Sequence, residues 1–182
     1  YMLRKIFNTF GYTFSRTHKS ISLDEIIKLR LKFFPVDILL DVGANKGKFT
    51  EYFKDEFQSY HLFEPNPNLI EELKEKFKSK KFKVLDFGCG NNNEQIKLNL
   101  TNDSAKSLSS IKKQTNELKI NFRNTNVVDS FQIEIKRLDD YLDTLELKDS
   151  KIFLKIDTQG NDFETLIGLG KYISNVQFLK IE

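Results

Sequence analysis

Short apolar runs bounded by turn residues recur along the chain and alternate with longer segments of helical periodicity. A run of this kind is typical of a strand that is buried on both faces of a parallel sheet. One run, at 131–135, instead alternates apolar and polar residues and predicts a strand with one exposed face. The predicted strands span residues 37–41, 60–64, 82–87, 95–100, 131–135, 151–157 and 176–181.

Between these runs, apolar residues recur every three or four positions, as on the buried face of a helix. Ser22 and Glu25 match a capping box ahead of the first helix, and Asn66 followed by Pro67 is a favourable helix start. The predicted helices span residues 23–34, 49–57, 67–77, 138–145 and 161–169. Strands that alternate with helices predict an α/β fold with a doubly wound, mostly parallel, Rossmann-like sheet.

Two segments between the predicted strands follow neither period. Gly88, Cys89 and Gly90 are followed by three asparagines, a composition that predicts a turn. Residues 101–126 are polar, rich in Ser, Asn and Lys, and have few apolar anchors. Structureless loops of that length are uncommon in compact domains and often act as lids, which is the expectation here.

The composition narrows the class of protein. With 182 residues the chain is long enough for one domain with a sizeable core. Its 29 basic and 26 acidic side chains are interleaved, which does not indicate a nucleic-acid partner. Cys89 is the single cysteine, so an internal disulfide is excluded and we expect a reducing, cytoplasmic location. No run approaches the roughly 18 apolar residues of a membrane span.

The chain is expected to have two parts, an N-terminal arm with a capping helix at 1–36 and a larger α/β domain at 37–182. Residues 2–14 are weakly amphipathic, with Phe and basic side chains. The favoured interpretation is an arm packed on its own domain or on a partner subunit, and the alternative is peripheral contact with a membrane surface. Residues 180–182 read as the interior of a strand, so one interpretation is a fragment that lacks C-terminal strands. The sequence does not indicate an oligomeric state.

The stretch LLDVGANKGKF, residues 39–49, places two of the chain's eight glycines at the end of the first predicted strand. In an open parallel sheet, ligands bind beyond the carboxyl ends of the strands, where the strand order reverses. Gly43 and Gly47 let the backbone turn tightly and approach a ligand closely. The amides at the start of the next helix are donors for an anion.

Glu64 ends the second predicted strand, 21 positions after Gly43. A carboxylate at that place can accept hydrogen bonds from both hydroxyls of a ribose, which favours a free 2'-hydroxyl over a 2'-phosphate. The pattern therefore predicts a nucleoside site. Because the glycine spacing does not match G-x-G-x-x-G, NAD is the second choice of cofactor.

Five blocks of sequence occur in order: D-V-G-A-N-x-G-x-F, F-E-P-N-P, S-L-S-S, L-D-D-Y-L and K-I-D-T-Q-G-N-D-F-E-T-L. From about residue 37 to residue 182, the chain resembles the FkbM-type methyltransferase family, a branch of the class I S-adenosylmethionine-dependent enzymes. The resemblance implies a class I methyltransferase sheet and a catalytic domain over 37–182. It also implies S-adenosylmethionine at the glycine turn, with Glu64 on its ribose. The cofactor contacts that it implies are Asp41, Gly43, Ala44, Asn45, Gly47, Phe63, Glu64, Pro65, Gly88, Cys89 and Asp157.

The reaction implied by the resemblance is methyl transfer to a hydroxyl oxygen, often of a sugar, a glycan or a secondary metabolite. Three features depart from the family pattern. Residues 86–91 read D-F-G-C-G-N in place of small residues and an acidic turn, Gln159 stands where the family often has Glu, and the usual strands after residue 182 are absent. The alternatives are a nucleotide-binding domain without catalysis and, less favoured, an NAD-dependent oxidoreductase.

Lys155 and Asp157 are charged residues in a strand otherwise built for burial, where an unpaired charge is costly. Asp157 ends that strand and faces the crevice, so we expect it to take the proton of the acceptor alcohol or to orient that alcohol. Lys155 is then its partner or a donor to the substrate, and the alternative is a structural ion pair. Gln159 and Ser107 are the candidates for contact with the acceptor.

No metal ion is expected. The alternative is a Mg²⁺ site in which Asp157, Asp162 and Glu182 converge as oxygen ligands. His61 lies in the middle of a predicted strand among apolar neighbours, so we expect a core residue with a satisfied ring rather than a base.

Overall fold

The computed structural model describes residues 21–101, 127–145, 147 and 149–182. The chain divides into two compact units, residues 1–33 and 34–182. The predicted arm at 2–14 and, except for residue 101, the predicted lid at 101–126 lie outside the described residues. No helix among the described residues is long and apolar enough to cross a membrane.

The first unit contains helix α2, Leu23–Phe33. It begins with the predicted capping box, in which the Glu25 amide donates to Ser22 Oγ (3.1 Å) and the Ser22 amide donates to Glu25 Oε2 (2.8 Å). Both bonds satisfy amides that have no partner within the first turn of a helix. The helix and its cap are confirmed, with the end one residue earlier than predicted.

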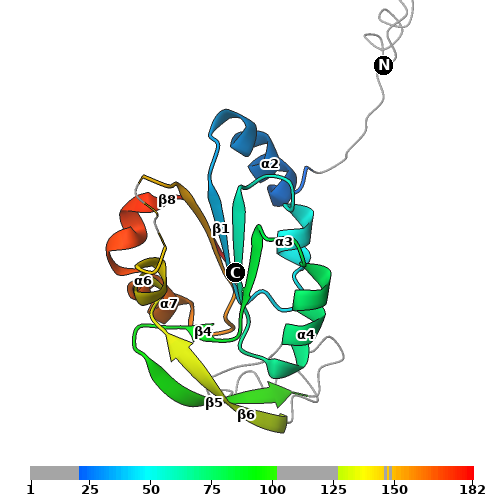
Figure 1. Cartoon of the computed structure of the whole chain (residues 1–182), viewed down its shortest axis with the longest axis vertical. Coiled ribbons are helices and arrows are strands. Elements are labelled where there is room, and N and C mark those ends of the chain that lie inside the picture. Colours follow the sequence, from blue (N-terminus) through cyan, green and yellow to red (C-terminus); the bar gives the residue numbers. More distant parts are fainter. Residues whose placement is uncertain (1–20, 102–126, 146, 148) are drawn as a thin grey trace, which may run out of the picture. The chain divides into compact units, whose positions relative to one another are not determined.

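The second unit is built on a sheet of five parallel strands, counted over the described residues, in the order β3-β2-β1-β7-β8 (Figure 1). The strands span Ile38–Val42 (β1), Ser59–Phe63 (β2), Phe82–Leu85 (β3), Ile152–Ile156 (β7) and Val176–Ile181 (β8). The order reverses between β1 and β7, because β2 and β3 are added on one side of β1 and the later strands on the other. Such a switch point is where an open parallel sheet forms a ligand crevice.

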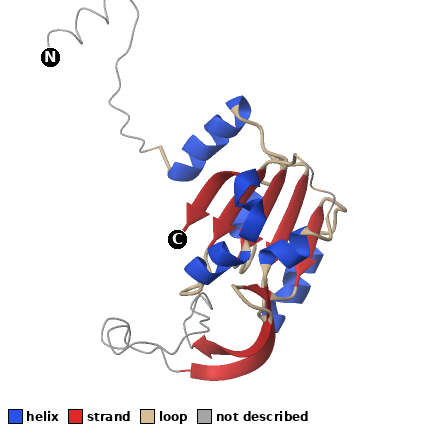
Figure 2. Cartoon of the chain, turned by 90° about the vertical axis from the view of Figure 1, so that its left-hand side faces the viewer, coloured by secondary structure: helices blue, strands red, loops and turns tan. Residues whose placement is uncertain are grey.

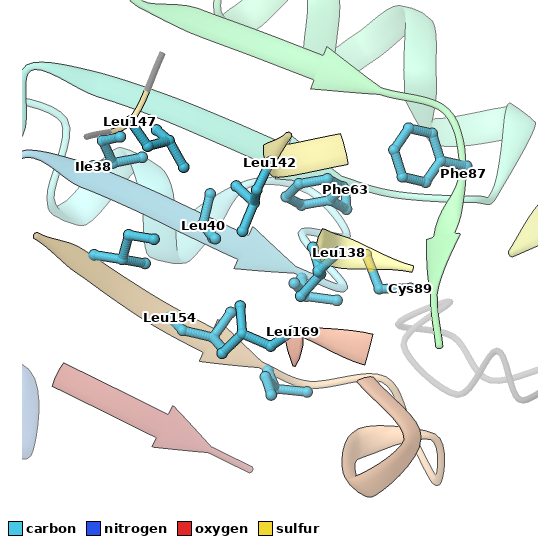
Figure 3. Packing of buried hydrophobic residues seen from close by; sticks show 13 residues of the cluster. Ile38, Leu40, Phe63, Phe87, Cys89, Leu138, Leu142, Leu147, Leu154 and Leu169 are labelled. Carbon is cyan, nitrogen blue, oxygen red and sulfur yellow. The ribbon is translucent and has the colours of Figure 1, made fainter. Parts of the chain in front are cut away.

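Helices and aromatic side chains cover both faces of this sheet. The helical elements of the unit are α3 (Lys48–Tyr52), α4 (Pro67–Lys76), α6 (Leu138–Leu142), α7 (Asp162–Gly168) and the 3₁₀ helix η1 (Gly170–Asn175). On one face, Leu40 of β1 and Leu154 of β7 belong to a buried cluster with Leu138 and Leu142 of α6 (Figure 3). This burial is the largest favourable term in holding α6 on the sheet.

The opposite face carries an aromatic cluster. Phe153 of β7 makes edge contacts with Phe49 of α3 and with Phe53 and Phe57 just after it, at centroid distances of 5.7, 6.1 and 5.8 Å. With both faces of β1 and β7 buried, the doubly wound α/β sheet predicted from the apolar runs is confirmed.

Helix α3 ends earlier than the apolar stripe at 49–57 predicted. The hydroxyl of Tyr60 binds the carbonyl and the amide that would form the next hydrogen bond of the helix. Tyr60 Oη donates to the carbonyl of Phe53 (2.8 Å) and accepts from the amide of Phe57 (2.9 Å). The start of α4 is as predicted, since Asn66 Oδ1 accepts from the amide of Asn68 (3.0 Å) and Pro67 occupies the first turn.

A second, smaller sheet has the order β4-β6-β5 and consists of β4 (Gly88–Cys89), β5 (Glu94–Thr101) and β6 (Val127–Lys136). The prediction of a turn at Gly88 and Cys89 is wrong, because these residues pair in parallel with Ile135 and Lys136 of β6. A Cβ atom on Gly88 would lie 2.6 Å from Ile135 Cδ1. Gly88 therefore lies against a side chain of β6 within the small sheet, and not in a turn.

Strands β5 and β6 form an antiparallel hairpin, with Leu98 opposite Phe131 and Ile96 opposite Ile133. Figure 1 and Figure 2 both show the hairpin beyond one end of the central sheet. It is connected to that end by β4, which follows β3 in the chain. This arrangement brings residues from β5 next to the carboxyl ends of the central strands.

Candidate functional site

Three chemically different residues follow directly on three neighbouring strands. The register pairs Val42 of β1 with Phe63 of β2 and with Ile156 of β7, so these three strand ends are level. Gly43, Glu64 and Asp157 are the next residues along each strand. Since strands lie about 4.8 Å apart, the backbones at Glu64 and Asp157 are about 10 Å apart, with the glycine turn between them.

The three residues line one pocket. The described lining residues are Val42, Gly43, Asn45, Phe63, Glu64, Pro65, Leu69, Gly88, Cys89, Leu98, Asp157, Thr158 and Gln159. Its cavity volume is about 100 Å³. That is below the roughly 300 Å³ of the smaller ligand sites in proteins, so a nucleoside needs the open mouth as well as the cavity.

The glycine turn is tight and pinned to β2. The amides of Gly43 and Ala44 both donate to the carbonyl of Phe63, at 3.0 Å each. Gly43 has φ +73°, and a Cβ atom there would collide with the backbone carbonyl of Asp157. Asn45 and Gly47 are also left-handed, with φ 50° and 67°. At Gly43 the absence of a side chain is therefore a condition for the close approach of β1 and β7.

Glu64 is buried in the pocket wall, with 6% of its surface exposed. Its Oε2 accepts from the amide of Asn45 (2.7 Å) and its Oε1 from the amide of Asn66 (2.9 Å). Burial raises the pKa of this carboxyl, against the effect of the two amides. Each oxygen of a carboxylate accepts more than one hydrogen bond, so both oxygens keep capacity for hydroxyl donors in the pocket.

A buried ion pair lies behind the glycine turn. Lys155 Nζ is 3.1 Å from Asp41 Oδ1, and it donates to the carbonyl of Gly43 (2.9 Å). Asp41 is fully buried and Lys155 is 4% exposed. Thr50 Oγ1 donates to Asp41 Oδ2 (2.7 Å), while Asp41 Oδ1 meets the ammonium as an ion pair without an aligned hydrogen bond.

Lys155 also lies 3.7 Å from Asp157 Oδ2. Its ammonium is thus directed at Asp41, the glycine turn and Asp157 from inside the protein. This geometry fits a positioning cation and a structural pair, and it does not fit a direct donor to a substrate in the pocket.

The turn after β7 presents Asp157, Thr158 and Gln159 to the pocket. Gln159 Nε2 donates to Asp157 Oδ1 (2.7 Å), and the Asp157 side chain remains 25% exposed. Asp162 supports the turn, because its Oδ1 accepts from both the amide and the hydroxyl of Thr158, at 2.8 Å each. The non-glycine residue Gln159 has φ 54°, a costly conformation that the surrounding hydrogen bonds maintain.

The Mg²⁺ alternative finds no support in these positions. Asp162 is engaged with Thr158, and Glu182 Oε1 pairs with Lys180 Nζ at 2.8 Å. Within the described ranges, no group of three His, Cys, Asp or Glu side chains lies close enough together to hold a metal ion.

The opposite end of the pocket, at β2 and β4, is apolar. Cys89 is buried there, and burial raises the pKa of its thiol well above the usual value, which disfavours the reactive thiolate. Its carbonyl accepts from Asn161 Nδ2 (2.8 Å) and Thr165 Oγ1 (2.9 Å), so it connects β4 to α7. Cys89 is therefore a wall residue of the site.

The candidates from the sequence separate into three groups. Nine of the fourteen line the pocket, including the predicted acceptor contact Gln159. Four are not among its described lining residues, and Ser107 lies outside the described residues. The four candidates that do not line it are Asp41, Ala44, Gly47 and Lys155. Sequence reasoning missed Val42, Leu69, Leu98 and Thr158. Thr158 is signalled by its place between two candidates, but nothing local distinguishes Leu98 from the other apolar residues of its strand.

His61 is buried in β2, where its Nδ1 lies 2.7 Å from Tyr141 Oη. Burial, with a smaller effect of Lys83, lowers the pKa of His61 to about 4. The prediction of a core histidine with a satisfied ring is confirmed.

Comparison with known families agrees with this geometry. The model of the methyltransferase FkbM domain matches residues 41–182. The chain belongs to the FkbM methyltransferase family. The match begins at Asp41 in β1 and continues to the last residue of the methyltransferase. All described pocket residues, from Val42 to Gln159, therefore lie within the matched region. Searches of curated proteins and of solved structures found no match.

Proposed function

We propose that this methyltransferase uses S-adenosylmethionine as methyl donor and transfers the methyl group to a hydroxyl oxygen. The observation that carries the proposal is the convergence of Gly43, Glu64 and Asp157 on one pocket from three level strand ends. The acceptor class, a small molecule or a glycan, rests on the family resemblance. A cytoplasmic location stays a prediction from the single cysteine.

The pocket residues fit this cofactor. Glu64 has acceptor capacity for two ribose hydroxyls, and the bare backbone at Gly43 allows a ligand to come close. Apolar side chains at the β2 and β4 end, including Phe63 and Leu69, suit the faces of a purine. When bound, S-adenosylmethionine supplies a methyl group on a positively charged sulfur, and the carboxylates of Glu64 and Asp157 favour a cation in the pocket.

Asp157 is the residue that we assign to the proton of the acceptor. An alcohol must lose its proton during methyl transfer, and a carboxylate within hydrogen-bond reach can take it. Gln159 donates to one oxygen of Asp157, and Lys155 lies near the other. These contacts hold the carboxylate in one orientation, while its partial exposure leaves it accessible to an acceptor.

Cofactor binding is tested by thermal unfolding with S-adenosylhomocysteine, S-adenosylmethionine or NAD. At 100 times the dissociation constant, a ligand of the native state stabilises it by about 2.7 kcal/mol, or roughly 5 to 10 °C in Tm for this size. We expect this shift with the two sulfur nucleosides and almost none with NAD. The reverse order, or no shift with either, contradicts the proposal.

Glu64→Ala should remove the shift, because the ribose hydroxyls lose their acceptor. Glu71→Ala is the matched control, since Glu71 is an exposed glutamate on α4 whose partner is Lys74. Equal ligand shifts in both variants would mean that the ribose does not lie at Glu64.

Turnover is tested with Asp157→Asn against a panel of glycans and small alcohols, with radiolabelled S-adenosylmethionine. We expect a loss of about 10²- to 10⁴-fold in turnover, the usual contribution of a general base, with cofactor affinity retained. Unchanged turnover would remove Asp157 from the catalytic role. Cofactor binding without turnover on the whole panel, in the wild type, would favour the non-catalytic nucleotide-binding domain.

A further inference from the structure

The β5–β6 hairpin contributes one residue to the pocket, Leu98. Its side chain is buried and belongs to a small cluster with Ile133 and Ile135 of β6. It lines the same cavity as Glu64 and Asp157, although it comes from the second sheet. The hairpin therefore forms one wall of the candidate cofactor site.

The contacts around Gly88 show at which end of the pocket this wall lies. A Cβ atom on Gly88 would lie 2.6 Å from Ile135 Cδ1 and 3.6 Å from Pro65 Cγ, so Gly88 is enclosed by these two side chains. Pro65 follows Glu64 at the end of β2, and Ile135 is the cluster neighbour of Leu98. Leu98 thus adjoins the β2 end, whereas Asp157 lies two strands away at the end of β7.

A nucleoside whose ribose hydroxyls bind Glu64 extends in two directions from that carboxylate. Its 5' substituent has to reach Asp157, where the acceptor is placed by the proposed function. Its base then extends toward Pro65, Leu69 and Leu98. This end is apolar, as the faces of a purine require, and Leu98 is one of the side chains that line it.

We propose that Leu98 is a specificity-determining residue, whose side chain limits the size of the base edge that lies farthest from the ribose. The inference rests on the proposed function, because it takes the ribose to bind at Glu64. A leucine at this position admits unsubstituted adenine and excludes bases with a large group on the remote edge. The limit comes from a side chain of the hairpin and not from the central sheet.

The test compares Leu98→Ala with wild type in calorimetric titrations with three probes. These are S-adenosylhomocysteine and its analogues with a benzyl group at N6 or a phenyl group at C2, the positions on the remote edge. Since one methylene in an apolar pocket changes affinity by about tenfold or more, at least one analogue should bind Leu98→Ala about tenfold or more tightly than wild type. Affinity for S-adenosylhomocysteine itself should fall, because alanine leaves part of the base without its wall, so the preference for an analogue over S-adenosylhomocysteine rises further.

Ile133→Ala is the matched control, because Ile133 is buried in the same cluster but is not among the described residues that line the pocket. It should loosen the hairpin core without admitting either analogue. An equal gain in Ile133→Ala, or no gain in Leu98→Ala, overturns the role of Leu98. If wild type fails to bind S-adenosylhomocysteine itself, the proposed function falls as well, so the two failures are distinguishable.

Leu98→Phe provides a second test if the alanine variant does not fold. The larger ring should fill the base end and weaken binding of S-adenosylhomocysteine by about tenfold or more, measured at a temperature at which the variant is folded, since the added volume lowers Tm by roughly 2 to 12 °C. Unchanged affinity in a folded Leu98→Phe protein also overturns the proposal.

Discussion

Replacement of Lys155 by methionine should destabilise the protein strongly, because it leaves the carboxylate of Asp41 buried without its cation. Methionine keeps a similar apolar stem and removes the ammonium. The carboxylate then retains the hydroxyl of Thr50, 2.7 Å from Oδ2, but loses the Nζ atom 3.1 Å from Oδ1. The carbonyl of Gly43 loses its donor in the same change.

The burial of the pair determines the magnitude. Asp41 is fully buried and Lys155 is 4% exposed, so solvent does not replace the lost interaction. Removal of one partner from a buried ion pair costs about 3 to 5 kcal/mol. The exposed pair of Lys78 and Glu75, with side chains 67% and 74% accessible, provides the comparison. Lys78→Met should cost less than about 1 kcal/mol.

Urea unfolding followed by circular dichroism measures both effects. With a slope of about 2 kcal/mol per molar urea, Lys155→Met should lower the midpoint by about 2 M and Lys78→Met by less than about 0.5 M. The double variant Asp41→Asn/Lys155→Met should be more stable than the sum of the two single changes predicts, because it leaves no unpaired charge. Similar small shifts for Lys155→Met and Lys78→Met would refute the reasoning and would mean that water reaches the pair.

Two further predictions concern the turn and the core. Gly43→Ala should lower the free energy of unfolding, measured with urea, by more than Gly170→Ala does. Both glycines are left-handed, which costs a side chain about 1 to 2 kcal/mol, but only at Gly43 does the new Cβ atom meet a backbone carbonyl. Equal losses in the two variants would contradict the close approach of β1 and β7. The pKa of His61 is lowered to about 4 in the folded protein, whereas the unfolded chain binds a proton there near pH 6.5. The free energy of unfolding is therefore unaffected by this group above about pH 6.5 and decreases by roughly 3 kcal/mol as the pH falls to 4. The stability advantage of wild type over His61→Asn should therefore shrink by about that amount between pH 7 and pH 4 in urea titrations, and a constant difference would disprove the assignment.

Local features of the chain were predictable from the sequence because their causes are local. The capping box at Ser22 and Glu25 involves residues three positions apart, and the apolar runs at 37–41 and 151–157 predict burial on both faces by their composition alone. The side of the sheet at which Gly43 and Glu64 meet follows from a general property of parallel strands, whose carboxyl ends point the same way.

The tertiary structure alone decided the features that depend on contacts between distant segments. Gly88 and Cys89 form a strand because β6, more than 40 residues later, pairs with them, and turn composition carries no information about that partner. Lys155 is bound to Asp41 as well as to Asp157, which depends on the register between β1 and β7. Leu98 enters the pocket because the hairpin folds against the end of the central sheet. The periodicity of one segment shows which of its side chains are buried, whereas packing between segments determines which residues those side chains contact.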